Sequence, residues 1–339
     1  MKTVKLEDAV GLRLAHDITE IRPGEFKGRA FAMGHEVREV DLCRLRRLGK
    51  NNLYVLELAA DEVHENEAAA ILAAALAGEG VECEGPPREG RINLLAGRDG
   101  LLTVDVAALA AFNMTGDVMC ATLHDRSMVG RGERVAATRA IPLAVKREAV
   151  KRAAATAAGG VVAVRPLRRA RAGLIVTGDE IHRGLIEDRF LPVLSAKVEA
   201  LGSRVAATLI VPDDAAAIAR AIRDHLSAGC DLLLLGGGMS VDPDDVTRHG
   251  IRLAGADDLH YGAAALPGAM FLVASLGDTP LLGVPACALF HRATVLDLIL
   301  PRILAGERPG AADLALLGHG GLCRGCDPCR FPICPFGRG

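Results

Sequence analysis

The C-terminal half of the chain alternates between short, wholly apolar runs and segments whose apolar residues recur every three to four positions. The first pattern is typical of strands buried on both faces, and the second of helices that cover a sheet. Their alternation predicts an α/β domain with three layers, in which helices cover both faces of a parallel sheet. The predicted strands are 173–177, 204–211, 231–235, 270–275 and 281–284, and the predicted helices are 186–201, 215–228 (capped by Asp213 or Asp214) and 286–304.

The N-terminal half shows shorter apolar runs between Gly, Pro and Asp turns, which predict a mixed α/β region and then a β-rich module. The sequence Gly85-Pro86-Pro87 marks the boundary between them. The four expected parts are 1–87 (mixed α/β), 88–170 (β-rich), 171–310 (α/β) and 318–339 (a cysteine-rich tail). Helices are predicted at 41–47 (capped by Asp41), 65–77, 106–112 and 144–157, and strands at 52–58, 92–95, 101–106, 118–123 and 133–138.

The composition argues against two classes of partner. The formal net charge is −2, aromatic residues make up 3 % of the chain and Trp is absent, so neither a basic field nor stacking platforms favour nucleic acid. No apolar run approaches the roughly 18 residues of a membrane span, and the N-terminus MKTVKLEDAVG lacks the apolar core of a signal peptide. We therefore expect a cytoplasmic protein that binds neither nucleic acid nor a membrane.

Two polar loops follow predicted strands of the C-terminal domain. The first is Thr177-Gly178-Asp179-Glu180, and the second runs from Gly236 to Thr247 with the sequence GGGMSVDPDDVT. Ligands of open parallel sheets sit beyond the carboxyl ends of the strands, so both loops are expected to open on one crevice. The chain has neither a G-x-x-x-x-G-K-[ST] phosphate loop nor a G-x-G-x-x-G turn after a strand, which disfavours an ordinary P-loop ATPase or dinucleotide dehydrogenase.

The residue types in these loops suit a phosphorylated, partly heterocyclic ligand. A glycine run lets main-chain N–H groups approach an anion without obstruction by Cβ atoms, and the hydroxyls of Ser240 and Thr247 add donors. The carboxylates of Asp179 and Asp245 repel phosphate but can hold Mg²⁺ that bridges to it, or can accept hydrogen bonds from a polar ring. The alternative is that the glycines form only a tight turn and that the aspartates cap helices.

The two loops in this order, with Gly283-Val284-Pro285 after them, resemble the molybdopterin-binding domain of molybdenum-cofactor biosynthesis proteins over about residues 170–306. The resemblance implies binding of molybdopterin or its adenylylated form, with acidic residues that assist adenylyl transfer or metal insertion. The residues it assigns to the site are Asp179 and Asp245 as catalytic groups, and Thr177, Gly178, Glu180, Gly236, Gly237, Gly238, Ser240, Thr247 and Pro285 as cofactor-binding groups.

The resemblance also implies a place in molybdenum or tungsten cofactor maturation, a molybdo- or tungsto-enzyme as partner and a homodimer. More faintly, residues 8–18 are similar to the opening helix of the molybdotransferase branch, and the β-rich module to its small barrel. The PDDVT sequence fits the competence-damage branch equally well, whose members hydrolyse pyridine nucleotides. Molybdotransferase, adenylyltransferase, non-catalytic carrier or sensor, and nucleotide hydrolase all remain open.

The chain departs from the molybdotransferase pattern at two places. That branch reads G-L-P-G-N-P where this chain has GVPACA, which puts Cys287 in the altered loop as either a ligand-facing thiol or a small apolar residue. The C-terminal β-domain of the branch is also replaced by the cysteine-rich tail. The altered loop favours a carrier over a metal-inserting enzyme.

The tail holds four cysteines in the spacing C-x2-C-x2-C-x4-C, followed by Pro335. Such a cluster suits four thiolates around one metal centre, because C-x2-C turns let two sulfurs converge on one ion. The successive short intervals favour a [4Fe–4S] cluster, while Zn²⁺ and four unligated thiols stay open. The predicted ligands are Cys323, Cys326, Cys329 and Cys334.

Overall fold

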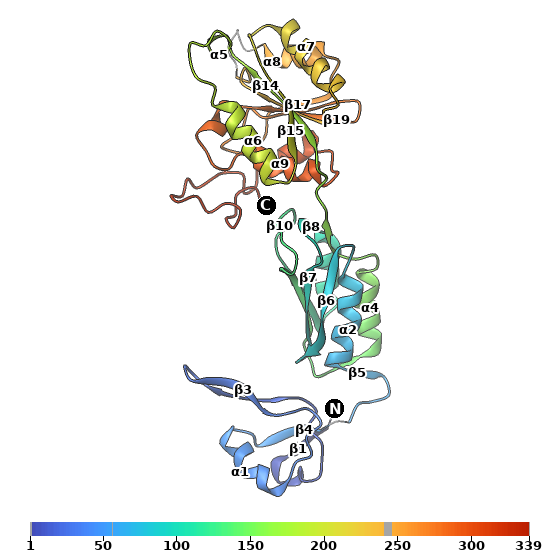
Figure 1. Cartoon of the computed structure of the whole chain (residues 1–339). Coiled ribbons are helices and arrows are strands. Elements are labelled where there is room, and N and C mark those ends of the chain that lie inside the picture. Colours follow the sequence, from blue (N-terminus) through green and yellow to red (C-terminus); the bar gives the residue numbers. More distant parts are fainter. Residues whose placement is uncertain (1, 56, 241–245, 339) are drawn as a thin grey trace. The chain divides into compact units, whose positions relative to one another are not determined.

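A computed structural model describes residues 2–55, 57–240 and 246–338 of the 339-residue chain (Figure 1). Two units have their own dense internal contacts. The first comprises Met1–Arg98, Leu102–Asp125 and Val129–Val164, and the second comprises Asp99–Leu101, Arg126–Met128 and Arg165–Gly339. The α/β domain predicted for the C-terminal half lies in the second unit.

The second unit is built on a six-stranded sheet with the strand order β15-β14-β16-β19-β18-β17. The strands β14, β15, β16 and β19 are parallel neighbours, whereas β18 and β17 run antiparallel at one edge. The strands are β14 (Arg171–Thr177), β15 (Arg204–Val211), β16 (Leu232–Gly236), β17 (Asp257–Tyr261), β18 (Leu272–Leu276) and β19 (Thr279–Val284).

Helices cover both faces of this sheet, as predicted (Figure 1). Alternate residues of each central strand face opposite ways, so Leu174 packs with α6 and α9 while Ile175 packs with α7 and α8. Each face has its own apolar core, which fixes the register of the central strands. The helices are α5 (Asp179–His182), α6 (Phe190–Ala200), α7 (Ala215–Ser227), α8 (Thr247–Leu253), η2 (Ala286–Leu289), α9 (Val295–Leu304) and α10 (Ala311–Leu316).

Two predictions for the second unit were wrong. The strand at 270–275 was expected in a parallel sheet, but only Gly277 and Asp278 separate β18 from β19, and a two-residue link permits only a hairpin. The helix expected from 286 to 304 is broken into η2 and α9. The break occurs because Thr294 begins α9 with a capping box: its hydroxyl accepts from Leu296 N at 3.3 Å, and the carboxylate of Asp297 accepts from Thr294 N at 2.7 Å.

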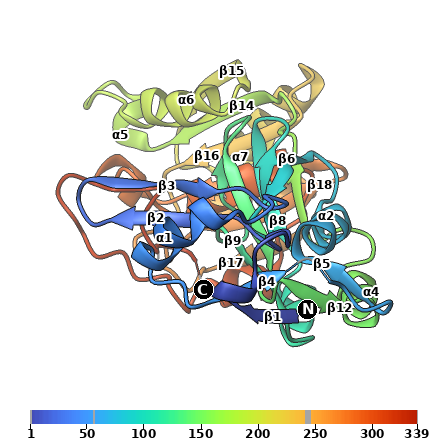
Figure 2. The same cartoon turned by 90° about the horizontal axis from the view of Figure 1, so that it is seen from below.

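The first unit contains the open four-stranded sheet β6-β7-β11-β9, whose apolar face packs against α2. The helices α2 and α4 lie side by side (Figures 1 and 2). The predicted boundary at Pro87 falls inside β6, which pairs with β7. The N-terminal half contains β1 (Lys2–Lys5), η1 (Leu6–Asp8), β2 (Ile18–Arg22), β3 (Phe26–Phe31), α1 (Glu39–Arg47), β4 (Asn52–Val55), β5 (Glu62–His64), α2 (Glu65–Leu76), β6 (Val81–Arg88), β7 (Arg91–Ala96), β8 (Gly100–Val104), α3 (Val106–Asn113), β9 (Val118–Thr122), β10 (Met128–Val129), β11 (Arg134–Ala140), β12 (Ala144–Lys146), α4 (Arg147–Thr156) and β13 (Val162–Arg165).

The faint N-terminal likeness to the molybdotransferase branch fails in two places. Residues 8–18 do not form a helix; instead Arg13 and Leu14 make bridges to Glu36 and Val55. The strands of the β-rich module belong to more than one sheet, and the largest of these sheets is open, with β6 and β9 at its edges, rather than a closed barrel. Asp41 lies at the third position of α1 and accepts a hydrogen bond from Arg38 N at 3.0 Å. It therefore caps the helix from within its first turn rather than as the residue before it.

Candidate functional site

The two polar loops leave the sheet side by side. Strand β14 pairs with β16 in parallel, and Val176 lies opposite Gly236, so the loops after Thr177 and after Gly236 begin at the same edge. The closing part of the second loop returns to the same place, because Thr177 Oγ1 lies 3.0 Å from Thr247 Oγ1. The expected meeting of the two loops is therefore seen for the described part of each. Asp245 lies outside the described residues.

The glycine loop packs closely against Thr177 and Thr247. A Cβ atom on Gly238 would lie 2.1 Å from Thr247 Oγ1, and one on Gly237 would lie 2.4 Å from the carbonyl oxygen of Thr177. Both glycines also have positive φ, 95° at Gly237 and 59° at Gly238, which side chains rarely adopt. The loop thus requires glycine for conformation and for space.

The threonines shape this loop from behind. Both are buried, and Thr247 Oγ1 also donates to the carbonyl of Gly237 at 3.3 Å. Their hydroxyls are therefore used within the protein, which differs from the donor role to a ligand expected for Thr247. Gly236 is buried too. It packs so closely against the ring of Phe190 in α6 that a Cβ atom would overlap the ring. These three residues support the loop, and Ser240 is the exposed one at its end.

Tyr261 and Arg248 fasten the far side of the glycine loop, and neither was singled out by the sequence. The Tyr261 hydroxyl donates to the carbonyl oxygen of Met239 at 2.7 Å. The Arg248 guanidinium lies 4.3 Å from the centre of the Tyr261 ring and donates to the carbonyl of Ser240 at 3.4 Å. A tyrosine at the end of β17 carries no local motif, so only the folded sheet shows its role.

The glycine loop forms one wall of a cavity of about 460 Å³, which we call the glycine-loop cavity. The segment Pro285–Cys287 after β19 forms a second wall, and the segment Leu266–Met270 between β17 and β18 forms a third. Predicted site residues Gly237, Gly238, Ser240 and Pro285 thus meet at one hollow. The third wall was missed, because it contains no charged or catalytic residue type.

The predicted acidic group of the first loop lies toward the neighbouring strand β15. Asp179 Oδ1 accepts from Asp213 N at 3.2 Å, and Asp213 Oδ2 accepts from Asp179 N at 3.0 Å. Arg183 also contacts Asp179 Oδ2 at 2.7 Å. Asp179 is half exposed and Glu180 is exposed, and neither lines the glycine-loop cavity. Of the two residues predicted to cap α7, Asp214 does so: its carboxylate accepts from Ala217 N at 2.7 Å, while Asp213 pairs with Asp179.

Cys287 lines the glycine-loop cavity, as the ligand-facing alternative for this residue required. Burial raises the pKa of its thiol above the usual value. At neutral pH the group is therefore an uncharged thiol, and its Sγ lies 3.9 Å from the carbonyl of Pro285. A neutral thiol suits an apolar part of a ligand better than a phosphate.

The tail cysteines are placed as separate thiols. Cys326 is exposed, whereas Cys323 and Cys334 are partly buried against the core that includes α6 and α9. Over residues 2–55, 57–240 and 246–338, no three His, Cys, Asp or Glu side chains are grouped so that they could hold a metal ion. The four-thiolate centre is thus not preformed, whereas the cation site predicted on Asp179 and Asp245 includes a residue outside the described ranges.

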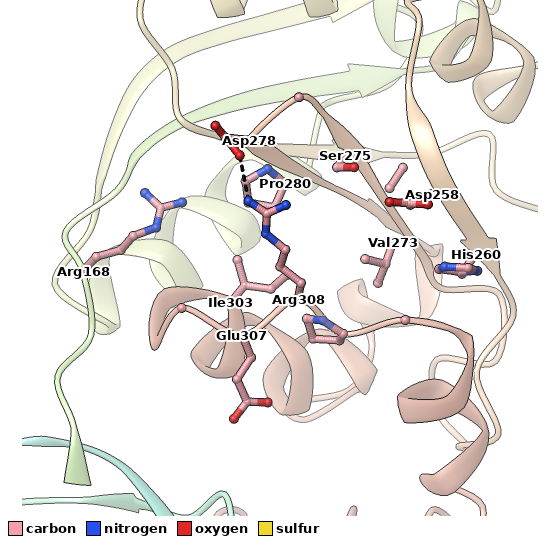
Figure 3. Close-up of a pocket in the computed structure, with 15 residues that line it drawn as sticks. Arg168, Asp258, His260, Val273, Ser275, Asp278, Pro280, Ile303, Glu307 and Arg308 are labelled. Atoms are coloured by element: carbon pink, nitrogen blue, oxygen red, sulfur yellow. Dashed lines mark hydrogen bonds and ion pairs between the residues drawn. The ribbon is translucent and has the colours of Figure 1, made fainter. Parts of the chain in front are cut away.

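A second cavity, of about 300 Å³, lies beside the start of β19, whereas the glycine-loop cavity lies beyond the end of that strand (Figure 3). Arg168, Asp258, His260 and Arg308 line it together with an apolar floor that includes Ile303. Arg308 forms an ion pair with Asp278 at 2.7 Å, shown as the dashed line in Figure 3. We call it the polar cavity. Its residues come from four separate segments and were not predicted.

Family comparison divides the chain in a similar way. Residues 173–305 match the family described as "Probable molybdopterin binding domain", and residues 3–57 match a domain of unknown function, DUF8806. The second unit therefore contains a domain of the molybdopterin-binding family, which confirms the predicted resemblance. None of the helices among the described residues is long and apolar enough to span a membrane.

Curated relatives match only in part. A "CinA-like protein" from Mycobacterium leprae is 40% identical over 78 residues, which are 23% of this chain and 18% of that protein. A "CinA-like protein" from Citrifermentans bemidjiense is 33% identical over 96 residues, which are 28% of this chain and 23% of that protein. The matched segment thus spans about a fifth of the length of these relatives.

Two solved structures were also compared. The tungsten cofactor synthesizing protein MoaB from Pyrococcus furiosus is 16% identical with a TM-score of 0.34, covering 42% of this chain and 98% of that chain. The protein CinA from Thermoplasma acidophilum is 19% identical with a TM-score of 0.33, covering 35% and 90%.

Proposed function

We propose that this chain, which carries a domain of the molybdopterin-binding family at residues 173–305, binds molybdopterin or its adenylylated form in the glycine-loop cavity. The observation that carries the proposal is the meeting of three loops at one hollow. One wall is the glycine loop, where a Cβ on Gly237 or Gly238 would overlap Thr177 or Thr247, so the backbone can follow this path only with glycine. The volume, about 460 Å³, suits a small organic ligand.

The residues divide the ligand between them. Gly237, Gly238 and Ser240 offer main-chain and hydroxyl groups to the phosphate of the pterin. The apolar wall from Leu266 to Met270 and the uncharged thiol of Cys287 receive the remaining, less polar part. Thr177 and Thr247 hold the loop in shape from behind.

Catalysis in this proposal belongs to Asp179 and Asp245. Together they would hold Mg²⁺, which would supply positive charge beside a reacting phosphate, and Asp179 would give up its exposed pair with Arg183 to do so. The chain would then act in molybdenum or tungsten cofactor biosynthesis, as an adenylyltransferase or in metal insertion. Without that chemistry it would be a carrier that delivers the cofactor to a molybdo- or tungsto-enzyme in the cytoplasm, with a homodimer as the working form.

A second candidate is supported by the matched relatives. The segments shared with the CinA-like proteins favour a pyridine-nucleotide hydrolase that uses the same cavity. Its substrate also carries phosphate and a heterocycle, so the geometry of the cavity suits both. The four tail cysteines would bind a [4Fe–4S] cluster or Zn²⁺ in either case.

Binding and product analysis separate these functions. Purified protein is titrated with molybdopterin under anaerobic conditions, and binding at micromolar concentration is the expected result. The protein is then incubated with Mg²⁺ and, in parallel, with molybdopterin plus ATP, ADP-ribose or nicotinamide mononucleotide. Asp179→Asn is expected to abolish turnover while binding persists. Absence of binding to molybdopterin overturns the main proposal, and hydrolysis of ADP-ribose establishes the second candidate.

A further inference from the structure

Three arginines lie in one row across three neighbouring strands of the first unit. Arg88 of β6 is directly opposite Arg91 of β7, and Arg91 is directly opposite Arg139 of β11. Directly opposed residues of antiparallel strands share one face of the sheet, with Cα atoms about 4.5–5.5 Å apart. The row lies on the face away from α2, because Ile92, the residue after Arg91, is buried in the core that contains the apolar side of α2.

The positive charge of this row is not paired at close range. All three arginines are exposed. Over residues 2–55, 57–240 and 246–338, none of their guanidinium groups has a salt bridge or a hydrogen bond. Like charges directly opposite each other destabilise a pair of strands. The row therefore costs stability in the unliganded protein, and a bound anion would remove that cost.

A hollow of about 490 Å³ is lined by all three arginines, and we call it the arginine-row cavity. A bulge in β6 shapes it. Glu84 of β6 is opposite Asn93 of β7, and Arg88 is opposite Arg91, so the segment 85–87 faces a single residue of β7. A bulge bends its strand away from the regular ladder. Two residues of this segment also line the cavity, so the bend lies beside the arginine row.

The carboxylates of the arginine-row cavity do not hold the arginines. Each of the three accepts a hydrogen bond from another group: Asp17 from Met33 N at 2.7 Å, Glu84 from Asn93 Nδ2 at 2.5 Å, and Glu89 from Thr19 Oγ1 at 3.4 Å. Asp17 is also paired with Arg29 at 3.3 Å. These carboxylates reduce the net positive charge of the hollow, but a ligand reaches the three guanidiniums without breaking an ion pair.

The tip of the β6–β7 hairpin is fixed, which fixes the spacing of the row. Glu89 and Gly90 form its two-residue turn, with φ of 50° and 70° as in a type I′ turn. Gly90 N donates to Asn66 Oδ1 in the first turn of α2 at 2.9 Å, and the Gly90 carbonyl accepts from Ala140 N at 3.0 Å. A Cβ on Gly90 would lie 2.8 Å from Glu65 Oε2. The backbone that carries the arginines is thus preorganised, so binding has to order only side chains.

We propose that the arginine-row cavity binds a small molecule with two or more linked phosphate groups, which bridge the guanidiniums of neighbouring strands. A guanidinium fork fits a carboxylate or a phosphate. One fork fills both oxygens of a carboxylate, whereas a terminal phosphate has three acceptor oxygens and can bridge two guanidiniums. The strands are about 4.8 Å apart, so a row of three favours a chain of phosphates. This site belongs to the first unit and does not depend on the proposed function.

Titration calorimetry of the full chain tests the ligand class. Phosphate, pyrophosphate and tripolyphosphate are compared at one low ionic strength without Mg²⁺, and citrate, a small polycarboxylate, is the carboxylate probe. We expect one tripolyphosphate per chain, an affinity at least about tenfold above that for phosphate, and weaker binding of citrate than of pyrophosphate. No binding of tripolyphosphate up to about 1 mM, or citrate binding as tightly as pyrophosphate, overturns the proposal.

Three variants locate the site. Arg91→Ala removes the central guanidinium and is expected to weaken tripolyphosphate binding at least about tenfold. Arg91→Lys keeps the charge but loses the fork, so it should recover only part of that loss. Arg134→Ala is the matched control, because Arg134 is an exposed arginine at the other end of β11 that does not line the cavity. An equal loss in Arg134→Ala would show a general charge effect and overturn the proposal.

Two further measurements separate this site from the fold and from the glycine-loop cavity. Arg91→Ala without ligand should unfold at the same temperature as the original chain or higher, because the variant removes repulsion within the row. Gly238→Ala, in the glycine loop, should bind tripolyphosphate as the original chain does. Loss of binding in Gly238→Ala with full binding in Arg91→Ala would place the phosphates in the glycine-loop cavity and overturn the proposal. Failure of molybdopterin to bind would overturn only the proposed function.

Discussion

The glycine-loop cavity and the polar cavity lie at opposite ends of strand β19 and are built in opposite ways. The first is formed by three continuous segments with a mostly apolar lining, and one of these segments is a glycine loop that has no room for side chains against Thr177 and Thr247. The second is formed by scattered side chains, and its arginines are already paired: Arg308 with Asp278, and Arg168 with Asp231 at 3.0 Å. A ligand enters the first without breaking an ion pair, whereas a charged ligand must break one in the second. A preformed hollow is therefore the better binding site, even though the other has more charge.

The largest effect is expected behind the polar cavity. Arg302 in α9 is 3% exposed and holds the carboxylates of Glu307, at 2.7 Å, and Asp313. Arg302→Met leaves both carboxylates without this partner in a partly buried place, which typically costs about 3–5 kcal/mol. Chemical denaturation is expected to show that loss in the free energy of unfolding, while Arg204→Met at an exposed position changes it by less than about 0.5 kcal/mol. If Arg302→Met loses only a little stability, the ion pairs of Arg302 do not stabilise the structure behind the polar cavity.

The next effect sharpens the contrast between the cavities at equal backbone strain. Gly238 in the glycine loop has φ 59°, and Gly277 beside the polar cavity has φ 57°, but a Cβ at Gly277 meets nothing within 4 Å. Gly277→Ala is expected to cost about 1–2 kcal/mol through its left-handed conformation alone. Gly238→Ala adds overlap with Thr247, so it should cost about 1–2 kcal/mol more and reduce molybdopterin affinity at least about tenfold. Equal losses in the two variants would show that the loop has space to relax.

A smaller effect comes from acid. Burial alone raises the pKa of Asp313, but hydrogen bonds from Gly310 N and Arg302 outweigh it and hold the pKa below the usual value of 3.8. A carboxyl group whose pKa is lower in the folded than in the unfolded protein stabilises the fold at any pH above its unfolded-state pKa. That contribution is lost as the pH falls through its folded-state pKa. Unfolding between pH 5 and 2 should therefore show a loss of stability below about pH 4. Asp313→Asn should be less stable at pH 7 and lose less on acidification; an unchanged acid profile would contradict the assignment.

The smallest effect is expected for the exposed pair at the mouth of the polar cavity. Arg308 and Asp278 are 79% and 96% exposed, and such pairs contribute about 0–1 kcal/mol. Arg308→Ala should change the free energy of unfolding by less than about 0.5 kcal/mol and leave molybdopterin binding unchanged. Thermal unfolding at low and high salt measures the first, and titration the second. A clear loss of molybdopterin affinity would indicate that molybdopterin binds at the polar cavity instead.

The glycine-loop cavity was partly predictable because local sequence determines its polar wall. The glycine run follows a clearly apolar strand, so Gly237 and Gly238 could be placed at the carboxyl end of that strand, and Pro285 was assigned to the same site by the family resemblance. Tyr261, Arg248 and the wall at Leu266 could not, because their roles depend on an antiparallel strand pair that the alternation of strands and helices conceals. Likewise, Asp179 was placed at the correct strand end, but its side chain is directed by Asp213 on the neighbouring strand. Side-chain direction across strands is a tertiary property.

Tyr261 has one more consequence. The chain contains two tyrosines and no tryptophan, and the other tyrosine, Tyr54, belongs to the first unit. Tyr261, which holds the glycine loop, is thus one of the two tyrosines that give this protein its tyrosine fluorescence. In a Tyr54→Phe variant Tyr261 would be the single tyrosine. Its fluorescence then becomes a built-in optical signal for whether that loop is occupied.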